Sequence, residues 1–340
     1  MHAVFISKHG GPDVLEVRQA PTPPPQRGEI RVEVKLAGLN FAEVSARQGL
    51  YPDAPKPPCV VGYEGSGVVE SLGEGVTTLD PGDRVLFMSR FGGHASHVVV
   101  PAEQAFPMPE SMSFEDAAAL PVNYLTAHHM LFEIARIRPG AHVLVHMAAG
   151  GVGTAALQLC RTVDDVTTYG TASARKHDYV RTHGCTHPID YRTRDYAQEI
   201  QRLTDGRGVD VILDALGGGD WAKGYALLRP VGILVAFGMA NTNTGRGTRS
   251  LVNLVKQLVR LPRYTPLRLM DDNRAIAGCN MGHLWDERAL LRRQVKALLH
   301  LYEQGAIRPH IHGIFGFDQA AEAFGELEQG RNQGKVLLRP

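Results

Sequence analysis

The segment His146-Met-Ala-Ala-Gly-Gly-Val-Gly carries the clearest chemical signal in the sequence. Read as A-x-G-x-x-G, it places Ala148, Gly150 and Gly153 at the three small positions of a dinucleotide-binding turn. Gly150 would let the backbone approach a pyrophosphate, Gly153 would let a helix pack closely on a strand, and the free N–H groups of that helix would bind the phosphate charge. Because Ala148 replaces the first glycine, a glycine-rich turn without a ligand remains the alternative.

The residues that follow the next apolar run indicate which dinucleotide the turn would bind. An NAD site places an acid about 20 residues beyond the turn, but residues 170–176 contain no acid and include Ser173, Arg175 and Lys176. A carboxylate about 4 Å from a 2′-phosphate would cost roughly 4 kcal/mol at an effective dielectric of 20. The sequence therefore predicts NADP(H), with Ser173 and Lys176 on the phosphate. The alternative is that Arg175 and Lys176 only begin a solvated helix.

The elements around this turn alternate between strands and helices. Apolar runs predict strands at 141–146, 166–170, 209–214 and 233–238, and an amphipathic helix follows the turn. This alternation is typical of a doubly wound parallel sheet. Residues 1 to about 120 differ, because short alternating runs punctuated by Gly and Pro predict a β-rich domain. Further helices are expected at 177–183, 290–302 and 318–329. The predicted fold class is α/β.

Composition and charge exclude several kinds of protein. The 340 residues include 36 Lys and Arg against 35 Asp and Glu, which argues against a dedicated nucleic-acid binder. Four isolated cysteines and a start without signal-peptide features predict a reducing, cytoplasmic location. Residues 141–160 lack Asp, Glu, Lys and Arg, but two histidines and the glycine turn argue against a membrane span.

Several longer strings resemble the zinc-free quinone oxidoreductase group of the medium-chain dehydrogenase/reductase superfamily, and especially its synaptic vesicle membrane protein (vesicle amine transport) homologues. Besides the glycine turn, they are Gly38-Leu-Asn-Phe-Ala-Glu, Ala46-Arg-Gln-Gly-Leu-Tyr, Thr186-His-Pro-Ile-Asp-Tyr and Gly334-Lys-Val-Leu-Leu. The resemblance covers the whole chain. It implies a GroES-like catalytic domain formed by residues 1–122 and 283–340, a Rossmann domain formed by residues 123–282, and a homodimer.

The resemblance also predicts that the protein works without a metal. Zinc-using members of the superfamily bind catalytic zinc at positions that correspond here to Asn40, Tyr63 and about Val122, none of which is a usual zinc ligand. The cysteine-rich structural zinc lobe is missing. The pairs His94/His97, His128/His129 and His310/His312 lack supporting cysteines and are interpreted as packed or solvated residues.

Without a metal, hydrogen-bond donors must stabilise the negative charge that hydride addition creates on an enone or quinone oxygen. The resemblance points to Asn40 and Tyr51 for this role, and Tyr63 and Tyr124 are further candidates. Each tyrosine could instead be only an aromatic wall of the pocket, and solvent could supply the proton. The expected partner is a small-molecule substrate.

The resemblance and the strand ends complete the predicted cofactor site. Thr126 and Asn40 are expected near the nicotinamide, Tyr191 near the adenine ribose, and Asn332 over the bound cofactor. The remaining predicted contacts come from the glycine turn and from the ends of strands: Gly150, Gly151, Val152, Gly153, Thr171, Leu216, Phe237, Gly238, Met239 and Cys279.

A basic segment offers a second hypothesis. No acid lies between Asp220 and Asp271, whereas an apolar helical face at 251–259 is accompanied by Arg246, Arg249, Lys256, Arg260, Arg263 and Arg268. Such a helix could rest on an anionic membrane, or it could form the wall of a cleft or dimer. The protein is thus either an NADPH-dependent quinone or enone reductase, or a cofactor-bound interaction protein with little turnover.

Overall fold

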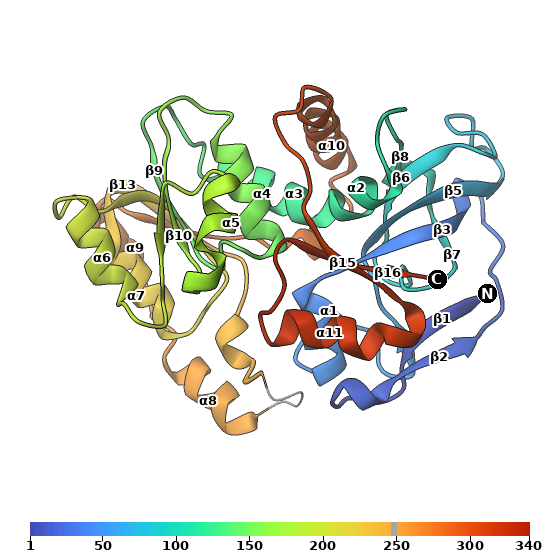
Figure 1. Ribbon diagram of the computed structural model, residues 1–340, viewed down its shortest axis with the longest axis horizontal. Coiled ribbons are helices and arrows are strands. Elements are labelled where there is room, and N and C mark those ends of the chain that lie inside the picture. Colours follow the sequence, from blue (N-terminus) through green and yellow to red (C-terminus); the bar gives the residue numbers. More distant parts are fainter. Residues whose placement is uncertain (246–249) are drawn as a thin grey trace.

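The computed structural model describes residues 1–245 and 250–340. Two large β-sheets lie side by side, each with its own helices, and the chain crosses from one to the other and back (Figure 1). Both termini lie at the β-rich end of the molecule, so the two ends of the chain build the same half (Figure 1).

The first sheet has six strands in the order β11-β10-β9-β12-β13-β14, and every neighbouring pair is parallel. In chain order this is 3-2-1-4-5-6, the arrangement of a Rossmann fold. The strands are β9 (His142–Val145), β10 (Thr167–Thr171), β11 (His187–Ile189), β12 (Val209–Asp214), β13 (Leu228–Ala236) and β14 (Ala275–Gly278).

Helices cover both faces of this sheet because its strands are apolar on both sides. In β9, Val143 and Val145 pack into one core cluster and Leu144 into another, as the two-residue repeat of a strand requires. The helices of this half are α4 (Gly151–Cys160), α5 (His177–Thr182), α6 (Tyr196–Leu203), α7 (Gly219–Leu227), α8 (Leu251–Val259) and α9 (Pro266–Asp272).

The second sheet joins the two ends of the chain. Its order is β15-β16-β3-β5-β6-β8, with β7 also paired to β3, and the last strand of the chain is antiparallel to β3. The strands are β3 (Glu29–Leu39), β5 (Glu64–Leu72), β6 (Arg84–Met88), β7 (His97–Pro101), β8 (Ala105–Pro107), β15 (Ile311–Gly316) and β16 (Lys335–Arg339). A small sheet of β1 (His2–Ile6), β2 (Leu15–Gln19) and β4 (Cys59–Val60) packs nearby. The remaining helices are α1 (Phe41–Gln48), α2 (Phe114–Ala119), α3 (Pro121–His128), α10 (Arg288–Glu303) and α11 (Ala320–Glu328).

The two halves meet directly at the glycine turn. The Gly334 N–H, just before β16, donates to the Ala149 carbonyl at 2.9 Å. Behind this contact, the Gln158 side chain of α4 donates to the Arg308 carbonyl and accepts from the Arg308 N–H, both at 2.8 Å. These bonds join the two halves of the molecule directly.

The predicted α/β fold class and the predicted strands are confirmed, with shifts at the ends. β13 begins at Leu228 rather than at residue 233. Pro230 and the left-handed Val231 (φ 64°) lie in this first part of the strand, and both features are more typical of a turn than of a strand. The predicted helix at 318–329 begins at Ala320, since Phe317–Gln319 form a 3₁₀ turn. The boundaries at 122/123 and 282/283 stay a prediction.

The described residues show whether any helix of the fold could cross a membrane. There, no helix combines the length and apolar character needed to cross a bilayer, and residues 141–160 form β9, the glycine turn and α4. The predicted apolar helix is present as α8, and its apolar side is largely exposed together with that of α9. Arg246 and Arg249 lie outside the described residues. The exposed apolar side chains of these two helices are Leu251, Val252, Val255, Leu258, Val259, Leu267 and Met270.

Candidate active site

The glycine turn has the geometry that a pyrophosphate needs. Gly150 is the N-cap of α4 and supplies no side-chain cap, so the first N–H groups of the helix are free for a ligand. A Cβ at Gly153 would lie 2.5 Å from the Met147 carbonyl oxygen and 2.7 Å from the Ala148 Cα, which shows how closely helix and strand pack. A Cβ at Gly150 would meet only the Met147 oxygen, at 3.3 Å. The turn therefore fits a dinucleotide.

Neighbouring strand ends support this turn. The Thr171 hydroxyl accepts from the Met147 N–H at 3.2 Å and bonds His146 Nδ1 at 3.1 Å, so this predicted cofactor ligand braces the turn. The Leu216 N–H donates to Asp214 Oδ1 at 2.6 Å at the end of β12. Phe237, Gly238 and Met239 follow β13 at the same edge of the sheet, where open α/β sheets bind their ligands.

Basic side chains gather at the end of β10. Lys176 is 7% exposed, and its ammonium donates to the carbonyls of Gly330 and Asn332. An ammonium has three donors, so one is left for a phosphate. Burial, with smaller contributions from Arg175 and Arg192, lowers the pKa of Lys176 to about 8. Arg192 was not among the predicted residues, since it follows the third strand of the sheet in chain order.

The other predicted cofactor residues lie on several different elements. The Thr126 hydroxyl donates to the Val122 carbonyl at 2.7 Å within α3, and the Asn332 amide donates to the Gly334 carbonyl at 2.9 Å. Cys279 is 9% exposed and follows β14, and Tyr191 is 55% exposed after β11. Ser173 is the N-cap of the 3₁₀ turn that contains Lys176. Their contacts with a cofactor stay predictions.

On the opposite wall, Asn40 lies at the centre of a buried polar cluster. Its amide oxygen accepts from the Lys335 ammonium at 2.6 Å, and its amide nitrogen donates to Glu64 Oε1 at 2.9 Å. Lys335 also forms an ion pair with Glu64, whose other oxygen accepts from the Val122 N–H at 2.6 Å. Glu43 Oε2 accepts from the Asn40 N–H at 2.7 Å. Because its amide is used internally, Asn40 orients the cluster rather than presenting a free donor.

Two tyrosines border this cluster. The rings of Tyr51 and Tyr63 lie 6.4 Å apart, edge to face. The Tyr63 hydroxyl is buried and has no hydrogen-bond partner among the described residues, although a buried hydroxyl normally has one. Burial raises the pKa of both tyrosines above the usual 10, so both stay protonated donors. Tyr124 differs, since its hydroxyl donates to Gln158 at 2.9 Å within the core and it is not part of this pair.

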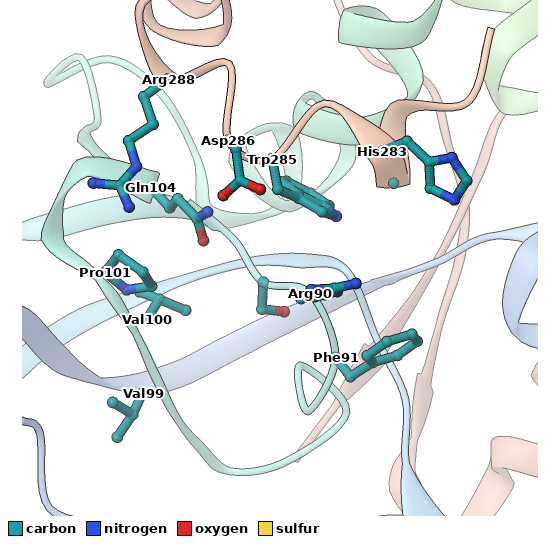
Figure 2. A pocket seen from close by; sticks show the side chains of 12 residues that line it. Arg90, Phe91, Val99, Val100, Pro101, Gln104, His283, Trp285, Asp286 and Arg288 are labelled. Atoms are coloured by element: carbon teal, nitrogen blue, oxygen red, sulfur yellow. The ribbon is translucent and has the colours of Figure 1, made fainter. Parts of the chain in front are cut away.

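A cavity of about 500 Å³ opens beside the tyrosines. Phe91 lines it and packs on the Tyr63 ring at 5.3 Å, and Gly282 lines it next to the Tyr51 hydroxyl. Figure 2 shows Trp285 and Arg90 facing this space from opposite sides. The Trp285 Nε1–H is buried without a partner among the described residues. Phe91 and Trp285 thus give the cavity aromatic walls, and Arg90, Asp286 and Arg288 give it charged ones.

Several of these residues escaped sequence reasoning. Glu43 could have been found, because an N-cap Asn40 followed three residues later by Glu is the spacing of a capping box. Lys335 lies 295 positions from Asn40, and no local pattern connects them. Trp285 and Arg90 also lie far from Asn40 in the sequence and carry no motif. In residues 1–245 and 250–340, no group of three or more His, Cys, Asp or Glu side chains is placed to hold a metal ion.

Comparisons with known proteins agree with this architecture. Residues 26–110 match the alcohol dehydrogenase GroES-like domain, and residues 183–338 match the zinc-binding dehydrogenase family. The rat synaptic vesicle membrane protein VAT-1 homolog is 46% identical over 100% of this chain and 84% of its own length. A Pseudomonas aeruginosa quinone oxidoreductase is 34% identical over 99% of both chains. The crystal structure of Escherichia coli quinone oxidoreductase complexed with NADPH superposes with a TM-score of 0.88, at 29% identity over 100% of both chains.

A GroES-like part joined to a Rossmann sheet, with a glycine turn facing the cleft, defines a two-domain dehydrogenase or reductase. The chain belongs to the medium-chain dehydrogenase/reductase superfamily, in the group that contains the VAT-1 homologues and the quinone oxidoreductases. The predicted family is thereby confirmed.

The packing at the turn predicts opposite effects for two glycine substitutions. Gly153→Ala should lower the free energy of unfolding by about 1–3 kcal/mol, because its Cβ would press on backbone atoms that cannot move freely. Gly150→Ala should leave stability nearly unchanged yet abolish dinucleotide binding, since its methyl group would occupy the open face of the turn. Urea denaturation and fluorescence titration with NADPH measure the two effects. Equal stability of both variants would contradict this account.

Proposed function

We propose that the protein is an NADPH-dependent, zinc-independent reductase that transfers hydride to a quinone or an α,β-unsaturated carbonyl compound. The observation that carries the proposal is the buried Tyr63 hydroxyl, which has no hydrogen-bond partner among the described residues and lies beside the Tyr51 ring. The glycine turn and Lys176 support NADPH as the cofactor. Solved relatives include a quinone oxidoreductase complexed with NADPH, which agrees with this choice.

In this proposal the reduced nicotinamide supplies a hydride, and side chains of the protein stabilise the negative charge that then develops on the substrate oxygen. The tyrosine hydroxyls donate hydrogen bonds to the substrate oxygen as it becomes an enolate or phenolate. Because they do not ionise near neutral pH, they are donors throughout the reaction. Lys335 and Glu64 hold Asn40 in place and thereby fix the floor of the site.

The cavity next to Phe91 and Trp285 accommodates the part of the substrate that lies away from the reacting carbonyl. Its aromatic walls favour a planar, apolar acceptor. The guanidinium groups of Arg90 and Arg288 favour an acceptor that carries an additional hydrogen-bonding oxygen. Both features suit quinones.

The proposal predicts the effect of removing the tyrosine hydroxyls. In a screen of NADPH oxidation with quinones and enones, we expect turnover with at least one acceptor, and Tyr63→Phe should lower kcat by about 10²–10³-fold. Tyr51→Phe should also lower kcat, with little change in NADPH affinity. Tyr169→Phe is the matched control, because it removes a buried hydroxyl that bonds His142 far from the cleft. No turnover with any acceptor, despite tight NADPH binding, would refute the proposed activity.

The pKa of Lys176 predicts how cofactor preference changes with pH. The ammonium that attracts the 2′-phosphate is present below pH 8 and is lost as the pH rises through about 8. The affinity ratio of NADPH to NADH should therefore fall above pH 8, by roughly 10- to 100-fold in total if one charged hydrogen bond is lost. Lys176→Met should show a low ratio at every pH. Fluorescence titrations from pH 6.5 to pH 9.5 measure it, and a constant ratio in the wild type would remove Lys176 from phosphate recognition.

The exposed face of α8 and α9 favours a second candidate function, in which the cofactor-bound protein interacts with an anionic membrane and turns over little. Val252 and Val259 are 81% and 80% exposed, and Lys256, Arg260, Arg263 and Arg268 lie along the same segment. An apolar face accompanied by cations suits the surface of an anionic bilayer. The same face could instead be the contact of the expected homodimer.

Vesicle sedimentation distinguishes these possibilities. If α8 contacts membranes, the protein should sediment with vesicles that contain phosphatidylserine, and high salt should release it. It should not sediment with neutral vesicles. The double variant Val255→Asp/Val259→Asp should abolish sedimentation. Light scattering of the same variant provides the other outcome, since a dimer that becomes a monomer would assign this face to dimerisation. Absence of salt-sensitive sedimentation would end the membrane proposal.

A further inference from the structure

The segment formed by residues 330–335 leads from α11 to β16, and its first part is bonded to the Rossmann half of the molecule. The Lys176 ammonium donates to the Gly330 carbonyl at 2.9 Å and to the Asn332 carbonyl. Among the described residues, no other donor bonds either carbonyl oxygen. The position of this part of the segment therefore depends on where the Lys176 ammonium lies.

Lys176 is a buried cation without a counter-ion. It is 7% exposed, and among the described residues no carboxylate forms an ion pair with it. Glu326 is the acid that partly offsets the fall in the pKa of Lys176, but its carboxylate is already bound to Arg331 at 2.7 Å and to His312 at 3.2 Å. A buried charge without a partner is costly, and a lysine side chain is flexible enough to return its ammonium to solvent. Lys176 therefore holds the segment weakly until an anion joins it.

The second part of the segment is packed too closely to move independently of the first. The Asn332 amide donates to the Gly334 carbonyl at 2.9 Å. A Cβ at Gly334 would overlap the His310 carbonyl oxygen and would lie 3.0 Å from the Tyr179 hydroxyl oxygen, which shows how little space surrounds this residue. Lys335 follows directly in the chain. A displacement of Asn332 would thus reach Lys335 within three residues.

We propose that the 2′-phosphate of the cofactor, by retaining the Lys176 ammonium in the site, secures residues 330–335 and so positions Lys335 and Asn40 for hydride transfer. The inference rests on the reductase activity proposed above. Lys176 is then a positioning residue as well as a phosphate ligand. NADH carries the same nicotinamide, but it lacks the phosphate and would leave the ammonium free to move to solvent. The 2′-phosphate therefore acts on the rate of hydride transfer and not only on affinity.

Single-turnover kinetics separate an effect on rate from an effect on affinity. The protein is saturated with NADPH or with NADH and mixed with the same acceptor, and the loss of nicotinamide absorbance is followed, so that cofactor release does not contribute. The wild type should transfer hydride about 10-fold faster from NADPH, because a small misplacement of the reacting groups is costly. Lys176→Met should transfer hydride from both cofactors at the slower rate. Equal rates for the two saturated wild-type complexes would show that Lys176 sets affinity alone, and the inference would be wrong.

Arg181→Met is the matched control for the loss of a cation. Arg181 lies on α5, is exposed, and is paired with Asp178 at 3.0 Å rather than with residues 330–335. The control should keep the wild-type ratio of the two rates. A ratio lowered as far as in Lys176→Met would assign the effect to the general charge of this region and would contradict the inference.

Hydrogen exchange tests the same coupling without turnover. The N–H groups of Gly334 and Lys335, which donate to Ala149 and His310, should exchange more slowly with NADPH bound than with NADH bound. In Lys176→Met the two cofactors should protect them equally. Equal protection in the wild type would overturn the inference whatever the acceptor. Failure of the wild type to reduce any acceptor, with the protection by NADPH still greater, would refute the reductase activity and leave the hold of Lys176 on the segment supported.

Discussion

The ammonium of Lys335 is the interaction on which the rest of the catalytic wall depends. It enters the interior where β16, β5 and the start of α1 meet, and it bonds Glu64 and Asn40 together. A buried carboxylate such as Glu64 is tolerable only with a cation and further donors around it. The Val122 N–H is one of these donors, so the same carboxylate also holds the start of α3. One buried charge thereby connects a strand, two helices and the Asn40 side chain.

This arrangement depends on closing the chain into one sheet. Lys335 reaches Asn40 only because β16 pairs with β3, with Val336 opposite Leu39. The same return of the chain carries Gly334 past the glycine turn and Asn332 to Lys176. The C-terminal segment therefore contacts the proposed cofactor site and the proposed catalytic wall within four residues. Few mutations in this segment would affect one site alone.

Charge is distributed unequally between the proposed cofactor site and the proposed catalytic wall, and this distribution fits the proposed chemistry. At the end of β10, Arg175, Lys176 and Arg192 form a basic group suited to a phosphate. At the proposed catalytic wall, burial raises the pKa of Tyr51 and Tyr63, so both are neutral hydrogen-bond donors. A substrate oxygen that gains charge during reduction would be stabilised there by hydrogen bonds in a site with little water. The neighbouring cavity adds the aromatic rings of Phe91 and Trp285 and the charged side chains of Arg90 and Arg288.

The sequence by itself determined what local patterns encode. Strand and helix periods predicted the alternating elements of the parallel sheet, and the spacing of Gly150 and Gly153 predicted the turn before α4. Local patterns did not predict where β13 begins, because Pro230 and the left-handed Val231 are typical of a turn rather than of a strand. They also failed to show that the Asn40 amide is occupied, since its partners come from positions 64 and 335.

Only the tertiary structure decided the charge state of the proposed site. A glutamate in a sequence is a carboxylate by default, whereas burial and the nearby Glu64, partly opposed by Lys335, raise the pKa of Glu43 to about 8. The same holds for the Tyr63 hydroxyl, whose lack of a partner is a property of its surroundings. Sequence patterns specify which residues are available, because periodicity and turn chemistry are local. Burial and long-range contacts specify what those residues can do, because pKa values and hydrogen bonds depend on every neighbour in space.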